Sequence, residues 1–395
     1  MSRAKSSIPK SDSMPVTTIN RVPRNLGLDL LRLFAILLVI GNHLRPPPSG
    51  KVGIVLACWM RGGWVGVDLF FVLSGYLVAG LLFKEYSRRG HISVMRFLVR
   101  RGLKIYPAFW ALIAFSVMVF WAKGQSVPFR NIAGELCFGQ NYFAHIWPHT
   151  WSLAIEEHFY LCLALAVSLL LRRRGLNPLS WFPVIFVVIA TACLALRILN
   201  AIRHPEYNYS WDLFPTHLRI DSLFFGAYLA YLSHFQRFEE RIAWLPTWSR
   251  LMIGFLLLMP AFLFARETHR WVTVIGFNLF YLGSGMLVLG IIKLQGTSFR
   301  FLRALGVLGA SSYSIYLWHV PINAWYAAKM LDAHPNAPGI YWGYVAICVG
   351  GALLFGYGMA VAVEVPILKL RDHFYPSATR ARAASPVDGT APLRP

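Results

Sequence analysis

The chain has 395 residues, of which 56% are hydrophobic and 14% are charged. This composition excludes an ordinary soluble domain, which needs far more charge to cover its surface. The net charge of +21 does not indicate a nucleic-acid partner, because the basic residues fall in short runs between apolar segments. The five cysteines are scattered and show neither a disulfide framework nor a metal-ligand motif, so no bound metal is expected.

The apolar residues come in segments of about 20, the length that a helix needs to cross ~30 Å of hydrocarbon. The sequence therefore predicts an all-α, polytopic membrane protein with about ten transmembrane helices in a lipid bilayer. The expected spans are residues 26–45, 62–83, 106–122, 151–171, 181–199, 216–235, 250–266, 271–292, 306–328 and 340–366. Lys and Arg are more frequent in the connecting segments on the side of the termini, so the positive-inside rule places both termini in the cytoplasm.

Two polar tails flank the predicted membrane domain, which covers residues 25–370. Residues 1–24 are basic and rich in Ser and Pro, and residues 371–395 are rich in Pro, Ala and Arg. Segments of such composition have too few apolar residues to form a packed core. Both tails are therefore expected to be disordered and cytoplasmic.

The first span, "LDLLRLFAILLVIGNH", carries Arg32 and His43 inside an apolar helix. The two residues lie on one stripe of the helix, about 16 Å apart along its axis, and Asp29 is close enough to pair with Arg32. The prolines that follow His43 are expected to end the helix. Two interpretations are open: a snorkelling arginine with a buried histidine bonded to a carbonyl, or a helix face that lines a polar cavity.

The second span begins "GGWVGVDLFFVLSGYL". Gly63, Gly66 and Gly75 are expected to allow close helix packing. Ser74 and Asp68 also lie in this span, and packing does not explain Asp68, because an unpaired carboxylate in lipid is costly.

A basic cluster, "RFLVRRGLKIYP", precedes the third span. Arg96, Arg100, Arg101 and Lys104 lead to Tyr106 on the predicted cytoplasmic side. One interpretation is an ordinary positive-inside anchor with an interfacial tyrosine. The other is a clamp for the phosphates of a polyanionic donor, because arginine binds phosphate oxygens in bidentate fashion.

The densest cluster of polar residues is "HTWSLAIEEHFYL" at the start of the fourth span. Ser152, Glu156 and Tyr160 share one helix face, and Glu157 points about 100° away. The predicted topology places Glu156 in the outer half of the membrane at a depth similar to His43. An acid there is expected to orient or polarise the histidine.

Two smaller clusters carry further ionisable residues. "HLRIDSLFFG" contains Arg219 and Asp221, and "SSYSIYLWHVP" contains His319. Each alone is compatible with a structural polar patch. Together, five spans bring ionisable residues to a similar predicted depth, which favours a shared polar site.

Six strings of residues, in order along 26–366, resemble the membrane-bound acyltransferase-3 family of bacterial surface-polysaccharide O-acyltransferases. They are "LDLLRLFAILLVIGNH", "GGWVGVDLFFVLSGYL", "FLVRRGLKIYP", "WSLAIEEHFYL", "RIDSLFFGAYLA" and "SYSIYLWHVPI". The resemblance implies a multi-pass enzyme of the bacterial inner (cytoplasmic) membrane. Such an enzyme transfers an acyl group, commonly acetyl from acetyl-CoA, to a hydroxyl of an extracytoplasmic sugar or polysaccharide. Acyl-CoA is then a co-substrate, and no permanently bound cofactor is expected. Some relatives carry a further soluble hydrolase-like domain, for which the segment past 370 is too short.

The resemblance also implies roles for single residues. Arg32 and His43 match the functional pair of the first helix, and Glu156 matches the acid of the WSL motif. The family's arginine pair falls on Arg101 and Lys104, and the lysine departs from the pattern because it lacks the bidentate fork. Acyl-CoA is expected to bind Arg101, Lys104, Arg100 and Tyr106. The supporting polar residues are Asp29, Asp68, Ser74, Trp151, Ser152, Arg219, Asp221 and His319.

The expected mechanism leaves two routes open. His43 acts as general base on a sugar hydroxyl, or it takes the acyl group itself before passing it on. A transporter or flippase for a lipid-linked sugar is the rival class, because the same polar stripe can line a translocation path. The sequence shows no inverted repeat of the kind common in secondary transporters, and a scaffold without chemistry leaves the buried ionisable residues unexplained.

Overall fold

The computed structural model describes residues 25–47, 53–172, 178–294, 299–334, 337 and 339–376. Within these ranges all regular secondary structure is helical, as the sequence predicts. The predicted tail 1–24 lies outside the described residues, as does 377–395 of the second tail. The last helix continues to Phe374, past the predicted domain boundary at 370.

The helices are described in chain order, and short 3₁₀ and π-helical segments join several of them. They are α1 (Leu26–Asn42), α2 (Ile54–Gly62), α3 (Gly66–Arg89), α4 (Val94–Ala122), α5 (Phe129–Leu136), α6 (Trp151–Arg172), α7 (Phe182–Arg203), α8 (Tyr209–Asp212), α9 (Ile220–Phe235), α10 (Phe238–Arg241), α11 (Thr247–Leu263), α12 (Trp271–Val274), α13 (Gly276–Ile291), α14 (Arg300–Ala310), α15 (Ser312–Ile322), α16 (Ala328–Ala333), α17 (Ile340–Ala346), α18 (Ala352–Met359) and α19 (Val365–Phe374).

Within the described residues, five helical stretches are long and apolar enough to cross a bilayer. They are Ile54–Arg89, Val94–Ala122, Pro148–Arg172, Pro178–Arg203 and Ile340–Phe374. Two shorter apolar helices, α11 and α13, accompany them. Each of the ten predicted segments overlaps with at least one of the observed helices. The chain is therefore an all-helical membrane protein.

Helix α4 begins earlier than the sequence predicts, at Val94 rather than near residue 106. Pro107 lies inside this helix instead of marking its start. A proline is tolerated in a membrane helix because neighbouring groups satisfy the freed carbonyl. The consequence is that Arg96, Arg100 and Lys104 lie on one helical face, at a spacing of four residues.

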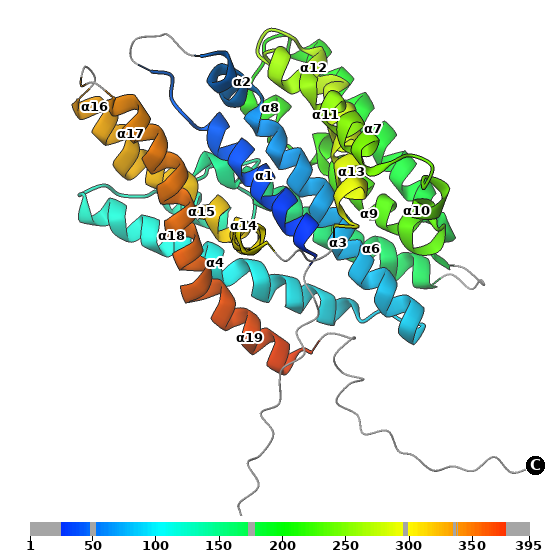
Figure 1. The fold of residues 1–395 in the computed structure, drawn as a ribbon. Coiled ribbons are helices and arrows are strands. Elements are labelled where there is room, and N and C mark those ends of the chain that lie inside the picture. The colour runs from blue at the N-terminus through cyan, green and yellow to red at the C-terminus, as the bar shows by residue number, and fades with distance from the viewer. Residues whose placement is uncertain are drawn as a thin grey trace, which may run out of the picture.

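The helices pack around a core between α1, α3, α6, α9, α13 and α15. Helix α3 packs against α9 and α1, and α19 lies beside α4 (Figure 1). The predicted glycine contacts are confirmed, because a Cβ on Gly63, Gly66 or Gly75 would collide with a carbonyl oxygen of the facing helix. Gly75 faces the carbonyl of Leu223, and Gly226 faces the carbonyl of Val72 in return. Close approach of α3 and α9 therefore depends on glycine.

Two buried ion pairs lie within this core. The Nη2 atom of Arg219 is 2.8 Å from Oδ1 of Asp68, and Nη2 of Arg197 is 2.9 Å from Oδ2 of Asp221. The guanidinium carbon of Arg219 also lies 3.6 Å from the centroid of the Phe277 ring. The two pairs thus connect α3, α7 and α9 inside the core, through Asp68, Arg197, Arg219 and Asp221.

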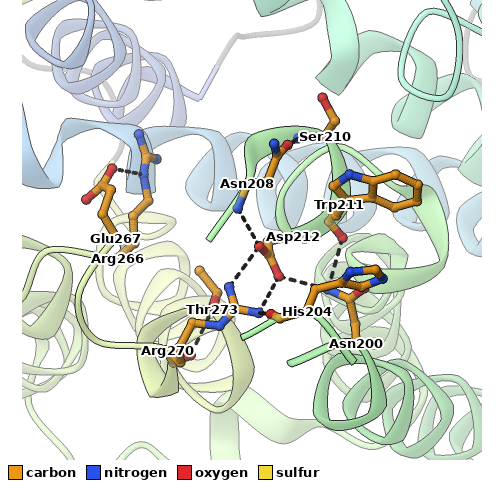
Figure 2. Close-up of polar contacts among 10 residues, drawn as sticks. All are labelled: Asn200, His204, Asn208, Ser210, Trp211, Asp212, Arg266, Glu267, Arg270 and Thr273. Atoms are coloured by element: carbon orange, nitrogen blue, oxygen red, sulfur yellow. Dashed lines mark hydrogen bonds and ion pairs between the residues drawn. The ribbon is translucent and has the colours of Figure 1, made fainter. Parts of the chain in front are cut away.

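A polar cluster around Asp212 joins two connections that are distant in sequence (Figure 2). The Asp212 carboxylate accepts hydrogen bonds of 2.8 Å from the Nδ2 of Asn200, the backbone N–H of Asn208 and the Nη2 of Arg270. Arg270 also donates to the carbonyl of His204 at 2.9 Å. The segments that follow α7 and α11 therefore meet at one end of the molecule.

Candidate active site

A cavity of about 440 Å³ lies between α1, α3, α4, α6 and α15, with α19 at its edge. Its lining combines many cations with a group of hydroxyls and carboxylates. The polar residues that line it are Arg32, Ser74, Lys84, Glu85, Arg88, Arg96, Arg100, Arg101, Lys104, Ser152, Glu156, Tyr160, Ser312, Tyr313, Tyr316 and Arg371. The structure thus brings together Arg32, Ser74, Ser152, Glu156 and the basic cluster, which the sequence predicts as site residues.

The basic part of the cavity is formed by the end of α3, the first half of α4 and the end of α19. Arg100 is held by Asp372, at 3.2 Å, and donates to the carbonyl of Tyr375. The guanidinium carbon of Arg101 lies 5.8 Å from the centroid of the Tyr160 ring. Cations gathered from three helices suit a ligand with several negative charges, because arginine pairs with phosphate oxygens by charge-assisted hydrogen bonds.

Arg32 enters the cavity from α1. It forms the predicted ion pair with Asp29, one turn earlier on the same helix. The interpretation of this helix face as the lining of a polar cavity therefore holds for Arg32.

Glu156 points into the cavity, as its predicted helix face requires. Its Oε2 accepts hydrogen bonds from Tyr160 at 2.7 Å and from Ser74 at 3.4 Å, and the two hydroxyls are 2.8 Å apart. These bonds direct Glu156 toward the cationic part of the cavity. The predicted contact between Glu156 and His43 is not formed, because packing of α6 against α3 turns this face toward Ser74 instead.

Tyr106 and Glu157 lie on the other side of these helices. The hydroxyl of Tyr106 donates to Oε2 of Glu157 at 3.0 Å, and its ring stacks on Trp110 at 5.3 Å. Neither residue belongs to the cavity lining. The structure therefore separates Tyr106 from the cations that the sequence grouped it with, because Tyr106 lies on a different face of α4.

His43 ends α1 beside His319, which in turn lies beside His149. Its Nδ1 is 2.9 Å from the carbonyl oxygen of Val39 and 3.3 Å from the Nε2 of His319. The rings of His43 and His319 are 4.8 Å apart, and the ring of His149 is 5.1 Å from that of His319. His149 and His319 are both buried. We refer to His43, His149 and His319 as the histidine cluster.

Tyr316 and Ser152 form a wall between the cavity and the histidine cluster. Both residues line the cavity. The Tyr316 hydroxyl donates to the carbonyl of His149 at 2.6 Å, so it accepts the 2.7 Å hydrogen bond from Ser152. The Tyr316 ring is also 5.4 Å from the ring of His319. The cavity thus reaches to within one side chain of the histidine cluster.

Trp151, the first residue of the WSL string, is buried beside this wall. Its ring stacks on Phe214 at 5.4 Å and lies 5.8 Å from the guanidinium carbon of Arg219. Trp151 therefore links the start of α6 to the buried ion pair of Arg219, and it does not line the cavity.

Three residues of this region are absent from the predicted site. His149 opens the string "HTWSL" and Tyr316 lies three residues before His319, so both belong to the motifs that the sequence analysis singles out. Glu135 on α5 had no sequence signal. It accepts hydrogen bonds from the backbone N–H groups of Ile146 and Trp147, at 2.9 and 3.1 Å. Burial raises the pKa of Glu135 to about 7.

Thr150 also donates to Glu135, at 2.9 Å from its Oε2. Glu135 therefore fixes the segment 146–150, which carries His149 into the histidine cluster. A carboxylate that accepts several hydrogen bonds is well suited to hold an irregular segment in one conformation.

Comparisons with known proteins identify the family of the chain. The family model described as an acyltransferase domain matches residues 25–360. The O-acetyltransferase OatA of Staphylococcus aureus strain NCTC 8325 / PS 47 is 30% identical over 347 residues, which cover 79% of this chain and 53% of that protein. A putative O-acetyltransferase, SACOL0978 of Staphylococcus aureus strain COL, is 25% identical over 330 residues, covering 78% of this chain and 52% of that protein. The chain thus spans about half the length of these curated relatives.

No solved structure matches the chain. The family model covers the first helix with His43, the basic cluster of α4, the WSL string on α6 and the histidine of α15. These are the elements that build the cavity and the histidine cluster. The chain therefore belongs to the acyltransferase-3 family of membrane acyltransferases.

Proposed function

We propose that the protein transfers an acyl group from cytoplasmic acyl-CoA to a hydroxyl of an extracytoplasmic sugar or polysaccharide. The names of its relatives, which are O-acetyltransferases, favour acetyl as the group transferred. One observation carries the proposal: a cavity with a cationic end reaches, at its other end, the wall of Tyr316 and Ser152 beside His43 and His319. This arrangement suits a donor with a phosphorylated end and a reactive end.

The cationic end is the proposed site for the phosphates of CoA. Arg101 and Lys104 face the cavity from α4, and Arg371 faces it from α19. Glu156, with Ser74 and Tyr160, lies in the same cavity, so we assign it to the donor and not to His43. The pantetheine arm then passes Arg32 toward the wall.

His43 is the proposed centre of the chemistry. In direct transfer, its Nε2 takes the proton from the acceptor hydroxyl while that oxygen attacks the thioester carbonyl. The carbon–sulfur bond breaks, and the thiolate of CoA takes the proton from His43. In the two-step route, Nε2 attacks the thioester carbonyl, the carbon–sulfur bond breaks and the thiolate of CoA leaves. The acceptor oxygen then attacks the acyl-imidazole, the bond from the acyl carbon to Nε2 breaks, and the hydroxyl proton goes to the thiolate. Both routes yield free CoA and an ester.

We also propose ten spans with both termini in the cytoplasm of a bacterial inner membrane. Contacts between the connecting segments support this topology. Asp212 and Arg270 join two predicted outer connections (Figure 2). Arg45, at the predicted outer end of the first span, pairs at 3.1 Å with Asp332 in another outer connection. Arg100 pairs with Asp372 between two segments predicted to lie in or next to the cytoplasm.

Purified protein in nanodiscs with radiolabelled acetyl-CoA and a membrane glycan extract tests the proposal. The wild type is expected to release CoA, and His43→Ala is expected to lose about 10²- to 10⁴-fold in rate, as for other general bases. His91→Ala is the matched control, because His91 is exposed between α3 and α4. Label on the protein before glycan is added indicates the two-step route.

A folded wild type that neither binds nor turns over acetyl-CoA contradicts the proposal. The rival function, transport of a lipid-linked sugar, is then measured directly. A fluorescent lipid-linked sugar in proteoliposomes that changes leaflet only when the protein is present would support the transporter.

A further inference from the structure

Each ring of the histidine cluster has one nitrogen facing a backbone carbonyl. The three contacts are His43 Nδ1 to Val39 at 2.9 Å, His319 Nδ1 to Tyr316 at 2.6 Å and His149 Nε2 to Leu317 at 3.2 Å. A carbonyl oxygen only accepts hydrogen bonds, so the nitrogen that faces it carries the hydrogen. The main chain therefore selects the tautomer of all three rings.

The tautomers give His43 and His319 complementary roles. Because Nδ1 of His319 carries its hydrogen, Nε2 of the neutral ring holds a lone pair. This Nε2 lies 3.3 Å from Nδ1 of His43, which is a donor. His43 thus shares its Nδ1–H between Val39 and His319, and its own Nε2 is left unprotonated. That nitrogen is the one a general base or a nucleophile needs.

We propose that His319 is a positioning residue for His43. By accepting the Nδ1–H, it holds the ring of His43 in one orientation and stabilises the imidazolium that forms when Nε2 takes a proton. This inference rests on the proposed acyl transfer and holds for both of its routes, since each begins at Nε2 of His43.

His319 occupies the place that a carboxylate holds in a Ser-His-Asp triad. Carboxylates on the surrounding elements are engaged elsewhere: Glu156 accepts from Tyr160, Asp29 pairs with Arg32, and Glu135 accepts from Ile146 and Trp147. His319 is itself fixed by the carbonyl of Tyr316 and by the ring of His149, which lies 5.1 Å away. A neutral partner held on two sides orients His43 without placing a negative charge against it.

Two substitutions separate the hydrogen bond from the volume of the ring. His319→Gln offers an amide oxygen near the position of Nε2, whereas His319→Leu offers no acceptor. We expect kcat of His319→Leu to fall about ten- to hundredfold, the loss for one hydrogen bond to a charged group. His319→Gln is expected to regain a large part of this loss. KM for acetyl-CoA is expected to stay within twofold in both, because His319 does not line the cavity.

The assignment would be overturned if folded His319→Leu and His319→Gln had the same kcat as each other. It would also be overturned if the substitutions affected only KM. A structural role alone lowers the amount of folded protein and leaves kcat per folded molecule unchanged. An inactive wild type would count against acyl transfer and not against the pairing of the histidines.

The pairing has a test that needs no activity. Solid-state ¹⁵N NMR of histidine-labelled wild type in bilayers reports which nitrogen of each ring carries a hydrogen, and the His43 signal is the one missing in His43→Asn. We expect His43 with protonated Nδ1 and unprotonated Nε2, and through-space coupling between His43 Nδ1 and His319 Nε2. A protonated Nε2 on neutral His43 would overturn the proposal.

Discussion

The hydroxyl of Tyr160 donates a 2.7 Å hydrogen bond to Glu156, one helical turn earlier on α6. This pair faces the cationic cavity, whereas the neighbouring Glu157 accepts from Tyr106 outside it. The two adjacent acids therefore provide a matched pair of variants. We expect Glu156→Gln to lower kcat/KM for acetyl-CoA about ten- to hundredfold, because charged hydrogen bonds at the donor are lost. The kcat/KM of Glu157→Gln for acetyl-CoA is expected to stay within twofold of the wild-type value.

The rate of CoA release from both variants checks this prediction. Equal losses, or a greater loss in Glu157→Gln, would contradict the assignment of Glu156 to the donor cavity.

The cations of α4 are expected to act on donor binding. Arg101→Ala and Lys104→Ala should each raise KM for acetyl-CoA about tenfold, since each removes a charge next to the proposed phosphates. Arg241→Ala removes an exposed charge from α10, outside the cavity lining, and should leave KM unchanged. Steady-state kinetics at fixed ionic strength compares them, and a similar KM in all three variants would rule out a specific phosphate site.

The contact between α3 and α9 is expected to tolerate no side chain at Gly75. Gly75→Ala drives a Cβ onto the carbonyl of Leu223 and should lower stability by about 1–3 kcal/mol. Gly80 lies on the same helix, but its nearest neighbour is Ala230 Cβ at 4.0 Å. Gly80→Ala should therefore be neutral or stabilise by up to about 1 kcal/mol. Apparent melting temperatures in detergent test this order.

The buried ion pair of Asp68 and Arg219 is expected to affect the stability of the fold far more than an exposed pair does. Asp68→Ala leaves Arg219 charged and fully buried, which should lower stability by about 3–5 kcal/mol. Asp332→Ala breaks the exposed pair with Arg45 and should change stability by less than about 1 kcal/mol. Unfolding in denaturant distinguishes the two variants, and comparable losses would refute the structural role of the buried pair.

Stability is expected to fall with rising pH through Glu135. Its pKa is raised from 4.5 to about 7 by burial, so the folded state binds this proton more tightly than the unfolded state. The resulting stability, about 3 kcal/mol, is fully present below pH 4.5 and is lost as the pH rises to about 7. Glu135→Gln removes the titration. Between pH 5 and pH 8 the melting temperature of the wild type should fall further than that of the variant, and parallel falls would contradict the prediction.

The helices and their close contacts were accessible from the sequence because they depend on local patterns. Apolar segments of sufficient length predict spans, and Gly63 and Gly75 lie where facing backbones need room. The pairing of Asp29 with Arg32 depends only on the spacing of two residues on one helix. Such features need no knowledge of how the helices are arranged.

The partner of His43 depends on that arrangement, so the sequence could not identify it. Glu156 and His319 both lie in predicted spans, and only the packing of α1, α6 and α15 decides which one meets His43. The contacts of Glu135 are even less predictable from the sequence, because its partners Ile146 and Trp147 come from an irregular segment with no periodicity. The sequence did not predict the early start of α4, because Pro107 indicates a helix boundary in a soluble protein but is tolerated inside a membrane helix.

The wall of Tyr316 and Ser152 has a consequence for the cell that carries this protein. A membrane at 100 mV drives each elementary charge with about 2.3 kcal/mol, so an open aqueous path through the bilayer would dissipate the ion gradient. Tyr316 and Ser152 line the cavity with side chains that are hydrogen-bonded to each other, and Tyr316 also donates to the carbonyl of His149. In the proposed reaction the acyl group crosses this point while the membrane keeps its insulation against protons and ions.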